Sequence, residues 1–306
     1  NQTSTMSSDS ATLKIAYWSI RGLGAPLRMM AEYRGVTYEA VLYNVTEKSD
    51  DAQGWDTDAW FGPKKQLAAA NPLLNLPYVM DGDKLITQSN ACIVYLGDKL
   101  GLMGSTDDER IEIEQLLCES MDLRDAIVKV AYGSKEEGGQ LKADLAKLMS
   151  HSSLRKIEKW FDLKNEAFTV SGKPTASDFH LWELLDQLTI AVPFAGGVGW
   201  RDDHPHLAQF YDTFRGLDEL KHYFGSKLYK LPVNNKMAHF GSATDGSGAK
   251  HEYGAAPHPT FEHRSQLRVA ANRIVTSARR VSPAMQQVIG VAIGVGIGLA
   301  LGLAKK

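Results

Sequence analysis

The spacing of apolar residues changes once along this 306-residue chain, near Gly104. Before that point, short β-rich runs alternate with helical patterns, in the order β-α-β followed by β-β-α. After it, apolar residues recur only at the three- and four-residue spacing of helices. This order predicts a small layered α/β domain followed by an all-helical domain.

Individual elements follow from the same spacing and from their flanking turn residues. In the first part we expect strands at 13–17, 37–43, 77–80 and 84–87 and helices at 26–34 and 89–100. In the second part we expect helices at 107–131, 140–161, 175–192 and 205–217. Thr175 and Asp178 form a capping signal for the third of these helices. The expected domains are a thioredoxin-like domain over 13–101 and an all-α domain over 102–241, after a flexible stretch at 1–12.

Charge and cysteine content limit the classes of function. The formal net charge is −2 overall, but the tail from Ser242 onward has eight Lys and Arg against three Asp and Glu. The body is therefore acidic, which argues against general nucleic-acid binding, whereas the basic tail suits anionic lipid or an acidic partner. The two cysteines, Cys92 and Cys118, suggest buried thiols and a reducing compartment. The close pair His204 and His206 lacks matching ligand spacing, so we expect no metal site.

The C-terminal segment carries a second, independent signal. Residues 288–304 form an uncharged run, and 283–304 is long enough to cross the roughly 30 Å hydrocarbon core of a bilayer. Arg279–Arg280 and Lys305–Lys306 flank it, as is usual at membrane surfaces. We therefore expect a transmembrane helix at 283–304, preceded by a linker at 242–260 and a basic amphipathic segment at 261–280.

Glycines recur every fourth residue within this segment: Gly290, Gly294, Gly298 and Gly302. On a helix they form one stripe, which allows a second helix to approach closely. The partner could be another copy of the chain or a different membrane subunit.

Tyr17 lies at the end of the first expected strand, ahead of the turn into a helix. A hydroxyl beside a helix N-terminus could stabilise a bound thiolate, although a lone tyrosine there is more often a core residue. Further along, a cis Leu76–Pro77 bond would turn the Leu76 backbone outward to pair with an extended peptide. Gln88 and Ser89 begin a helix, where free N–H groups and a hydroxyl suit a carboxylate.

Taken in order, these motifs resemble a cytosolic glutathione S-transferase of the mu class. The matching segments are Tyr-Trp-x-Ile-Arg-Gly-Leu from Tyr17, Asn-Leu-Pro-Tyr from Asn75, Ile-Thr-Gln-Ser-Asn-Ala from Ile86 and the stretch 231–238. The resemblance extends from about Lys14 to Gly241 and implies the glutathione transferase fold, with glutathione as cosubstrate and no metal. It explains none of the tail.

The resemblance also implies a role for each matching residue. Tyr17 would stabilise the glutathione thiolate, and Tyr132 would lie over the electrophile. The other implied contacts are with the glutathione backbone and glycyl end (Trp18, Leu23, Trp60, Lys64), its cysteinyl part (Asn75, Leu76), its γ-glutamyl carboxylate (Gln88, Ser89) and, across a subunit boundary, its amine (Asp122). Two departures stand out: the chain is about two residues longer between Trp60 and Asn75, and Leu73 falls where many members carry an aromatic residue at the dimer interface.

Two functions are compatible with these features. The first is a membrane-tethered glutathione transferase that conjugates glutathione to apolar electrophiles, peroxides included. The alternative is an accessory subunit of an organellar, energy-transducing membrane complex, in which the transferase fold acts as a docking module. Basic residues on both sides of a short span favour a mitochondrial membrane.

Overall fold

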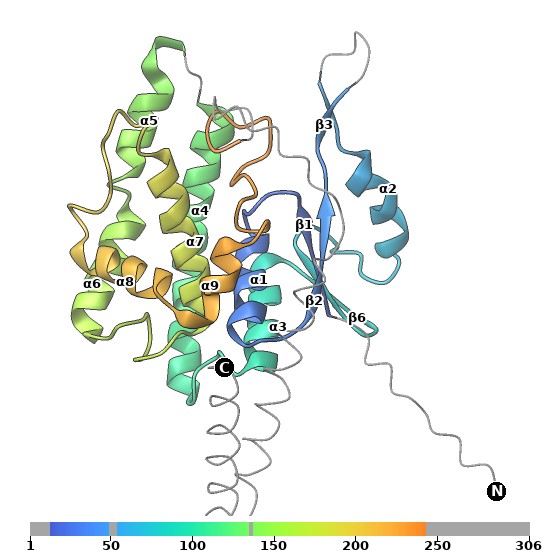
Figure 1. The fold of residues 1–306 in the computed structure, drawn as a ribbon, viewed down its shortest axis with the longest axis horizontal. Helices are drawn as coiled ribbons and strands as arrows, with labels where there is room; N and C mark the ends of the chain where they lie inside the picture. Colours follow the sequence, from blue (N-terminus) through green and yellow to red (C-terminus); the bar gives the residue numbers. More distant parts are fainter. Residues whose placement is uncertain (1–12, 49–53, 135–136, 243–306) are drawn as a thin grey trace, which may run out of the picture. The chain divides into compact units, whose positions relative to one another are not determined.

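The computed structural model describes residues 13–48, 54–134 and 137–242, which all lie within one compact unit of the chain, Asn1–Pro257 (Figure 1). The expected N-terminal stretch at 1–12, the basic segment, the transmembrane helix and its four glycines lie outside the described residues. Among the helices of the described ranges, none combines the length and apolar character that a membrane span requires.

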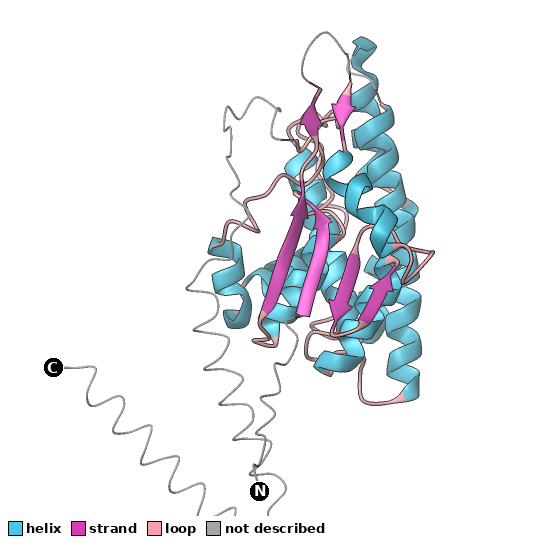
Figure 2. Cartoon of the chain, turned by 90° about the vertical axis from the view of Figure 1, so that its right-hand side faces the viewer, coloured by secondary structure: helices cyan, strands magenta, loops and turns pink. Residues whose placement is uncertain are grey.

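A four-stranded sheet forms the first layer, in the order β2-β1-β5-β6 (Figure 2). Its strands are β1 (Leu13–Trp18), β2 (Tyr38–Tyr43), β5 (Tyr78–Asp81) and β6 (Lys84–Thr87). β1 runs parallel to β2, so the chain must cross over between them, and α1 (Gly24–Tyr33) provides that crossover. β5 and β6 form the predicted antiparallel hairpin, whose turn includes Gly82 at φ +60°.

Helices cover both faces of this sheet. α1 and α3 (Ser89–Leu100) pack together on one face, and α2 (Asp58–Leu67) lies on the other (Figure 1). A separate two-stranded sheet joins β3 (Thr46–Glu47) to β4 (Trp55–Asp56). The layering confirms the predicted thioredoxin-like arrangement.

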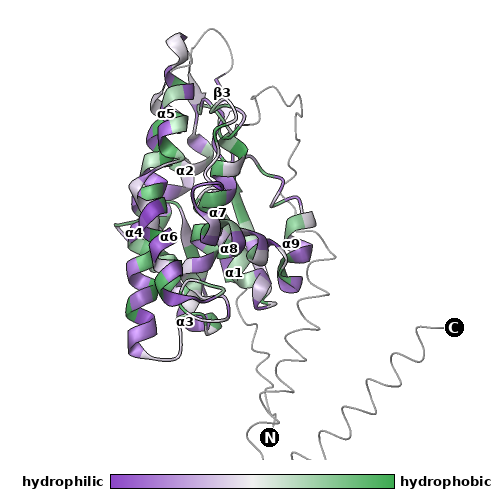
Figure 3. Cartoon of the chain, turned by 90° about the vertical axis from the view of Figure 1, so that its left-hand side faces the viewer, coloured by the Kyte–Doolittle hydropathy of each residue, from purple (hydrophilic) through white to green (hydrophobic). Residues whose placement is uncertain are grey.

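The second part of the chain is entirely helical within the described residues. Its helices are α4 (Asp107–Gly133), α5 (Gln140–Leu148), α6 (Ser152–Lys164), α7 (Ala176–Ala191), α8 (Pro205–Arg215) and α9 (Lys221–Gly225), with 3₁₀ turns at Glu137–Gly139 and Asp218–Leu220. Figure 3 shows mainly hydrophilic residues on the outward side of α4 and α6. By contrast, every residue from Ala176 to Leu188 in α7 is buried. α7 packs against α1, α3, α4 and α8 and is the central helix of the core.

The predicted capping box begins α7: the Thr175 N–H donates to Asp178 Oδ2 at 2.7 Å, and the Thr175 side chain bonds the third helical residue. Other predictions were wrong. The helix expected over 140–161 is two helices, because the chain breaks at Met149–His151 and the His151 ring accepts the Ser153 N–H to begin α6. Cys92 is buried as expected, but Cys118 is exposed. The short elements α2, α9, β3 and β4 were not predicted.

Candidate active site

Tyr17 is held against the turn that joins β1 to α1. A Cβ atom at Gly22 would lie 2.7 Å from Tyr17 Cε1, and one at Gly24 would lie 2.7 Å from Tyr17 Cβ. Gly22 also has φ +36°, a conformation that side chains rarely adopt. A side chain at either position would therefore clash with Tyr17, which is itself 5% exposed.

Charged and polar groups surround the Tyr17 hydroxyl. Burial raises the pKa of Tyr17, while Arg124, the Leu23 backbone N–H and Arg28 act in the opposite direction. The hydroxyl consequently keeps its proton at neutral pH, while its oxygen accepts hydrogen bonds from the Leu23 N–H and from Arg124. The proton remains available to an anion bound beside it.

Sequence reasoning missed Arg124, which lies on α4. A signal was present: Arg124, Val128 and Tyr132 occur at four-residue intervals, which places them on one helix face. All three side chains border the same cavity in the structure.

This cavity has a volume of about 300 Å³ and opens beside Tyr17. Four parts of the fold supply its walls: the end of β1 with the following turn, the α4 face, two residues of α7 and the segment after α9. The lining residues are Tyr17, Trp18, Ile20, Gly22, Leu23, Arg124, Val128, Tyr132, Leu184, Gln187, Val233, Asn234 and Asn235. The cavity thus places the predicted Tyr17 and Tyr132 at one site.

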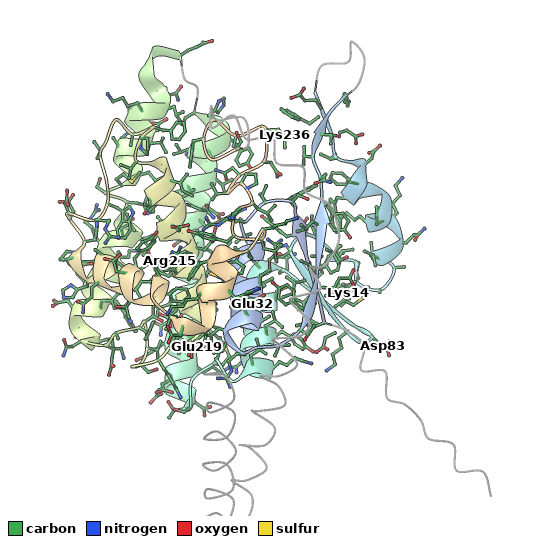
Figure 4. All side chains as sticks on the ribbon, viewed as in Figure 1. Lys14, Glu32, Asp83, Arg215, Glu219 and Lys236 are labelled. Carbon is green, nitrogen blue, oxygen red and sulfur yellow. The ribbon has the colours of Figure 1, made fainter. Side chains whose placement is uncertain are left out.

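Two backbone N–H groups of the segment after α9 donate hydrogen bonds to α4. The Asn235 N–H donates to the Tyr132 hydroxyl at 2.9 Å, and the His239 N–H donates to the Ala131 carbonyl at 2.8 Å. In Figure 4, Lys236 marks this segment between the helical part and β3. Since the Tyr132 oxygen accepts one bond, its own proton can still be donated into the cavity.

Most of the other predicted glutathione-binding residues lie around the same end of β1. Trp18 and Leu76 pack on the cluster of Tyr17, Ile20 and Leu23, together with Met121 of α4. Ser89 lies within 3.8 Å of the Met121 sulfur, measured from its hydroxyl oxygen. The fold therefore brings together segments that the sequence separates by more than 100 positions.

Trp60 belongs to a neighbouring apolar cluster, which Trp18 and Leu76 also contact, and Lys64 lies one helical turn further along α2. Trp60 is 1% exposed and packs against the rings of Tyr43 and Tyr78, at centroid distances of 5.1 and 6.1 Å. The Lys64 ammonium lies 5.6 Å from the centre of the Trp60 ring. Trp60 thus serves mainly as a core residue beneath Lys64, whose charge lies nearer the surface.

Asn75, Leu76 and Pro77 lead into β5. The Leu76–Pro77 bond is cis, which is the geometry considered from the sequence only as a condition for ligand pairing. The Thr87 hydroxyl accepts the Asn75 N–H at 3.0 Å and donates to the Asn75 carbonyl at 2.9 Å. Within the described residues the Leu76 N–H and C=O form no hydrogen bond, so this backbone can pair with an extended ligand.

Gln88 and Ser89 lie at the start of α3. Gln88 has φ 72° and ψ 122°, an uncommon conformation for a residue with a side chain, and its amide donates to the Leu73 carbonyl at 3.3 Å. Such a position next to free helix N–H groups suits a carboxylate. Asp122 is exposed on α4 and forms no ion pair within the described part of the chain.

A buried ion cluster lies behind the cavity. The Arg21 guanidinium contacts Glu183 at 2.7 Å and Asp186 at 2.5 Å, and all three side chains are nearly inaccessible to solvent. Gln187, which lines the cavity, donates from its amide to the other Glu183 oxygen at 3.0 Å. Arg21 of the Tyr17 motif is therefore a structural residue that joins the first layer to α7.

The histidine pair singled out in the sequence is used structurally. His204 Nδ1 lies 2.7 Å from the Trp200 carbonyl, whereas His206 Nδ1 contacts Glu158 at 2.7 Å. Over the described ranges, no group of three or more His, Cys, Asp or Glu side chains is arranged to hold a metal ion.

Comparison with known proteins gives matches over the described body of the chain. Residues 13–98 match the family profile described as the glutathione S-transferase N-terminal domain, and residues 121–227 match the C-terminal domain. Glutathione S-transferase Mu 1 of Oryctolagus cuniculus is 35% identical over 230 residues, covering 74% of this chain and 97% of the relative. The class-mu 26 kDa isozyme 51 of Fasciola hepatica is 33% identical, covering 74% and 95%.

Solved structures show the same fold. The glutathione S-transferase Blo t 8 superposes with a TM-score of 0.63 at 24% identity, covering 74% of this chain and 99% of its own. The Pi-class glutathione S-transferase of Onchocerca volvulus gives 0.59 at 25% identity, with the same coverage. The chain belongs to the glutathione S-transferase family and is a glutathione transferase that uses glutathione as its cosubstrate.

Proposed function

We propose that this transferase joins the sulfur of glutathione to soft electrophiles in the cavity beside Tyr17. The observation that carries the proposal is the position of Tyr17, which borders the cavity and belongs to the cluster that Trp18 and Leu76 contact. A thiolate next to this hydroxyl would meet an electrophile held under Tyr132.

In this mechanism the Tyr17 O–H donates a hydrogen bond to the thiolate and lowers the pKa of the bound thiol. Arg124 adds a positive charge on the same side. The thiolate attacks the electrophilic carbon, the carbon–sulfur bond forms, and the leaving group departs with its electron pair. Holding both reactants in one cavity replaces a bimolecular encounter with a positioned one.

The remaining contacts of glutathione are assigned to the residues around the end of β1. The Leu76 backbone would pair with the cysteinyl part beside Asn75, and Gln88 with Ser89 would hold the γ-glutamyl carboxylate. Lys64 would meet the glycyl carboxylate above Trp60, with Trp18 and Leu23 as apolar walls. Asp122 would reach glutathione bound to a second copy, and the apolar Leu73, 69% exposed, supports a homodimer.

A conjugation assay tests this proposal. The purified full chain, glutathione and 1-chloro-2,4-dinitrobenzene should yield the S-aryl conjugate and chloride, and substitution of Tyr17 by Phe should slow the reaction. Failure of the wild-type chain to bind glutathione or to form the conjugate would rule the proposal out.

We further propose that the tail tethers the enzyme to a membrane, and that this is a mitochondrial membrane. The support is the sequence of 283–304, with its uncharged run and flanking basic pairs. The full chain should float with lipid vesicles after alkaline carbonate treatment, whereas a chain ending at Gly241 should not. Equal flotation of the two chains would contradict the proposed tether. Cell fractionation would show which membrane the full chain occupies.

The alternative role, an accessory subunit of a membrane complex, depends on the same tail. The glycine stripe at Gly290, Gly294, Gly298 and Gly302 is compatible with a partner helix from a second copy or from another subunit. The two roles can be separated by the mass of the particle extracted in mild detergent. A free homodimer favours the tethered enzyme, and a larger stoichiometric assembly favours the accessory subunit.

A further inference from the structure

The cavity beside Tyr17 has one full charge in its lining, and that charge is positive. Of the 13 described residues that border it, Arg124 alone is ionised at neutral pH, and none is Asp or Glu. The nearest buried carboxylates, Glu183 and Asp186, are engaged by Arg21 behind Gln187. The cavity therefore favours an anion over a cation.

Arg124 has donors left for a ligand. Its Nη1 donates to Asp125 Oδ1 at 3.0 Å, but that carboxylate is 67% exposed and does not border the cavity. An arginine carries five N–H donors in a rigid fork, so one bond to Asp125 and the approach to Tyr17 do not exhaust them. The Arg124 side chain is itself 27% exposed, which leaves it partly shielded from water.

A second donor faces the same space. The Tyr132 hydroxyl oxygen accepts the Asn235 N–H, so its proton is free to be donated inward. Between Arg124 and Tyr132, Val128 of the same helix face presents an apolar surface, and Ile20 and Leu184 line other walls. The arrangement combines apolar walls with a cationic guanidinium.

We propose that the preferred electrophiles of this site carry a carboxylate, which Arg124 binds while the apolar walls hold the reacting part near Tyr17. At about 300 Å³ the cavity suits a single-ring aromatic acid. The proposal rests on the transferase activity proposed above and adds the class of its substrate. The carboxylate is not consumed: glutathione sulfur bonds to the ring carbon, the carbon–halogen bond breaks, and halide leaves with the electron pair.

A matched pair of substrates tests this idea: 4-chloro-3-nitrobenzoate and its methyl ester. Each kcat/KM is divided by the rate constant of the uncatalysed reaction with glutathione, which removes the intrinsic difference in reactivity. We expect the wild-type enzyme to favour the acid by about tenfold, the effect of one charge-assisted hydrogen bond. R124Q should abolish this preference and R124K should keep part of it. Because both substrates use the same thiolate, any effect of Arg124 on the thiolate cancels in the ratio.

Arg110 provides the matched control, since it lies on the same helix and pairs with Asp98 and Glu114 away from the cavity. R110Q should leave the acid-to-ester ratio unchanged. Should R124Q fail to fold, the wild-type ratio measured against NaCl concentration replaces it, and the preference for the acid should fall as salt rises.

Equal rate enhancement for acid and ester by the wild-type enzyme, or an unchanged ratio in R124Q, would overturn the proposal. Absence of conjugation with both compounds and with 1-chloro-2,4-dinitrobenzene would instead overturn the transferase proposal itself. The two failures are therefore distinguishable.

Discussion

The hydroxyl of Tyr132 accepts the backbone N–H of Asn235 at 2.9 Å, which joins α4 to the segment after α9 across 103 positions of the chain. Both residues line the cavity, so this bond connects two of its walls.

Substitution of Tyr132 by Phe removes the acceptor and leaves the Asn235 N–H without a partner. A net loss of about 1 kcal/mol should make the segment open roughly five times more often. Hydrogen–deuterium exchange at Asn235 should therefore accelerate by that factor. Tyr95→Phe is the control, because Tyr95 bonds Asp81 at the opposite end of the sheet from Tyr17. Unchanged exchange at Asn235 in Tyr132→Phe would show that other contacts hold the segment.

Substitution of Tyr17 by Phe removes the donor proposed for the thiolate. The bound thiol would then ionise at higher pH, and kcat/KM at neutral pH should fall by at least about tenfold. The pH profile of kcat/KM should shift to higher pH while glutathione still binds. Tyr33→Phe, on α1 but outside the cavity, should leave the profile in place. A lower rate without a shift in pH would assign Tyr17 a role in packing only.

Substitution of Gly24 by Ala should disturb the position of Tyr17. The added methyl would lie 2.7 Å from Tyr17 Cβ and 2.8 Å from an Arg28 nitrogen, and Tyr17 Cβ belongs to the fixed base of its side chain. We expect a loss of about 1–3 kcal/mol in the free energy of unfolding, with lower activity. Gly225→Ala is the control, since nothing lies within 4 Å of the added atom. Equal stability of the two variants would contradict the close approach.

Substitution of Glu32 by Gln should change how stability depends on pH. Glu32 lies on α1 (Figure 4), and burial raises the pKa of its carboxyl from 4.5 to about 8, against the hydrogen bond from Tyr38. Between these pH values the unfolded chain is ionised at Glu32 while the folded chain keeps the proton. Wild-type stability therefore decreases as pH rises through this window.

In the Glu32→Gln variant residue 32 cannot ionise, so the stability of the variant relative to wild type should increase from pH 4.5 to 8. The expected increase is on the order of 1–2 kcal/mol, because the partial exposure of Glu32 weakens the effect of burial. Denaturant unfolding of both proteins at several pH values measures the difference. A difference that is constant across pH would show that the Glu32 carboxyl titrates normally.

Substitution of Arg21 by Met should be strongly destabilising. It leaves the buried carboxylates of Glu183 and Asp186 without their cation, at a cost of roughly 3–5 kcal/mol. Adding Glu183→Gln should restore part of that loss, because one unpaired charge is removed. Denaturant unfolding of the single and double variants gives the comparison. A double variant less stable than the single one would contradict the charge explanation.

Elements with local signals were predicted closely. The helix expected at 89–100 is α3 with the same bounds, and Gly101 ends it at φ 67°. Thr175 and Asp178 begin α7 as predicted. In both cases the residue that ends or begins the helix satisfies backbone groups only a few positions away, so the information is contained within one turn.

Elements that depend on distant contacts were predicted less well. The break at Met149–His151 carries no glycine or proline, and α6 begins there through a bond of the His151 ring. The exposure of Cys118 depends on what other segments pack beside it. Helical spacing alone does not say which face of α4 is covered.

The local structure of this protein was readable in its residues: the strand–turn–helix with Tyr17, the start of α3 at Ser89, and the change to helices after Gly104. These depend on backbone geometry over a few neighbouring positions. Only the packing of α4 and of the segment after α9 against β1 decided what faces the Tyr17 hydroxyl. Arg124, Tyr132 and Asn235 meet there because the helices bury their apolar faces together, and such long-range burial has no local signature in the chain.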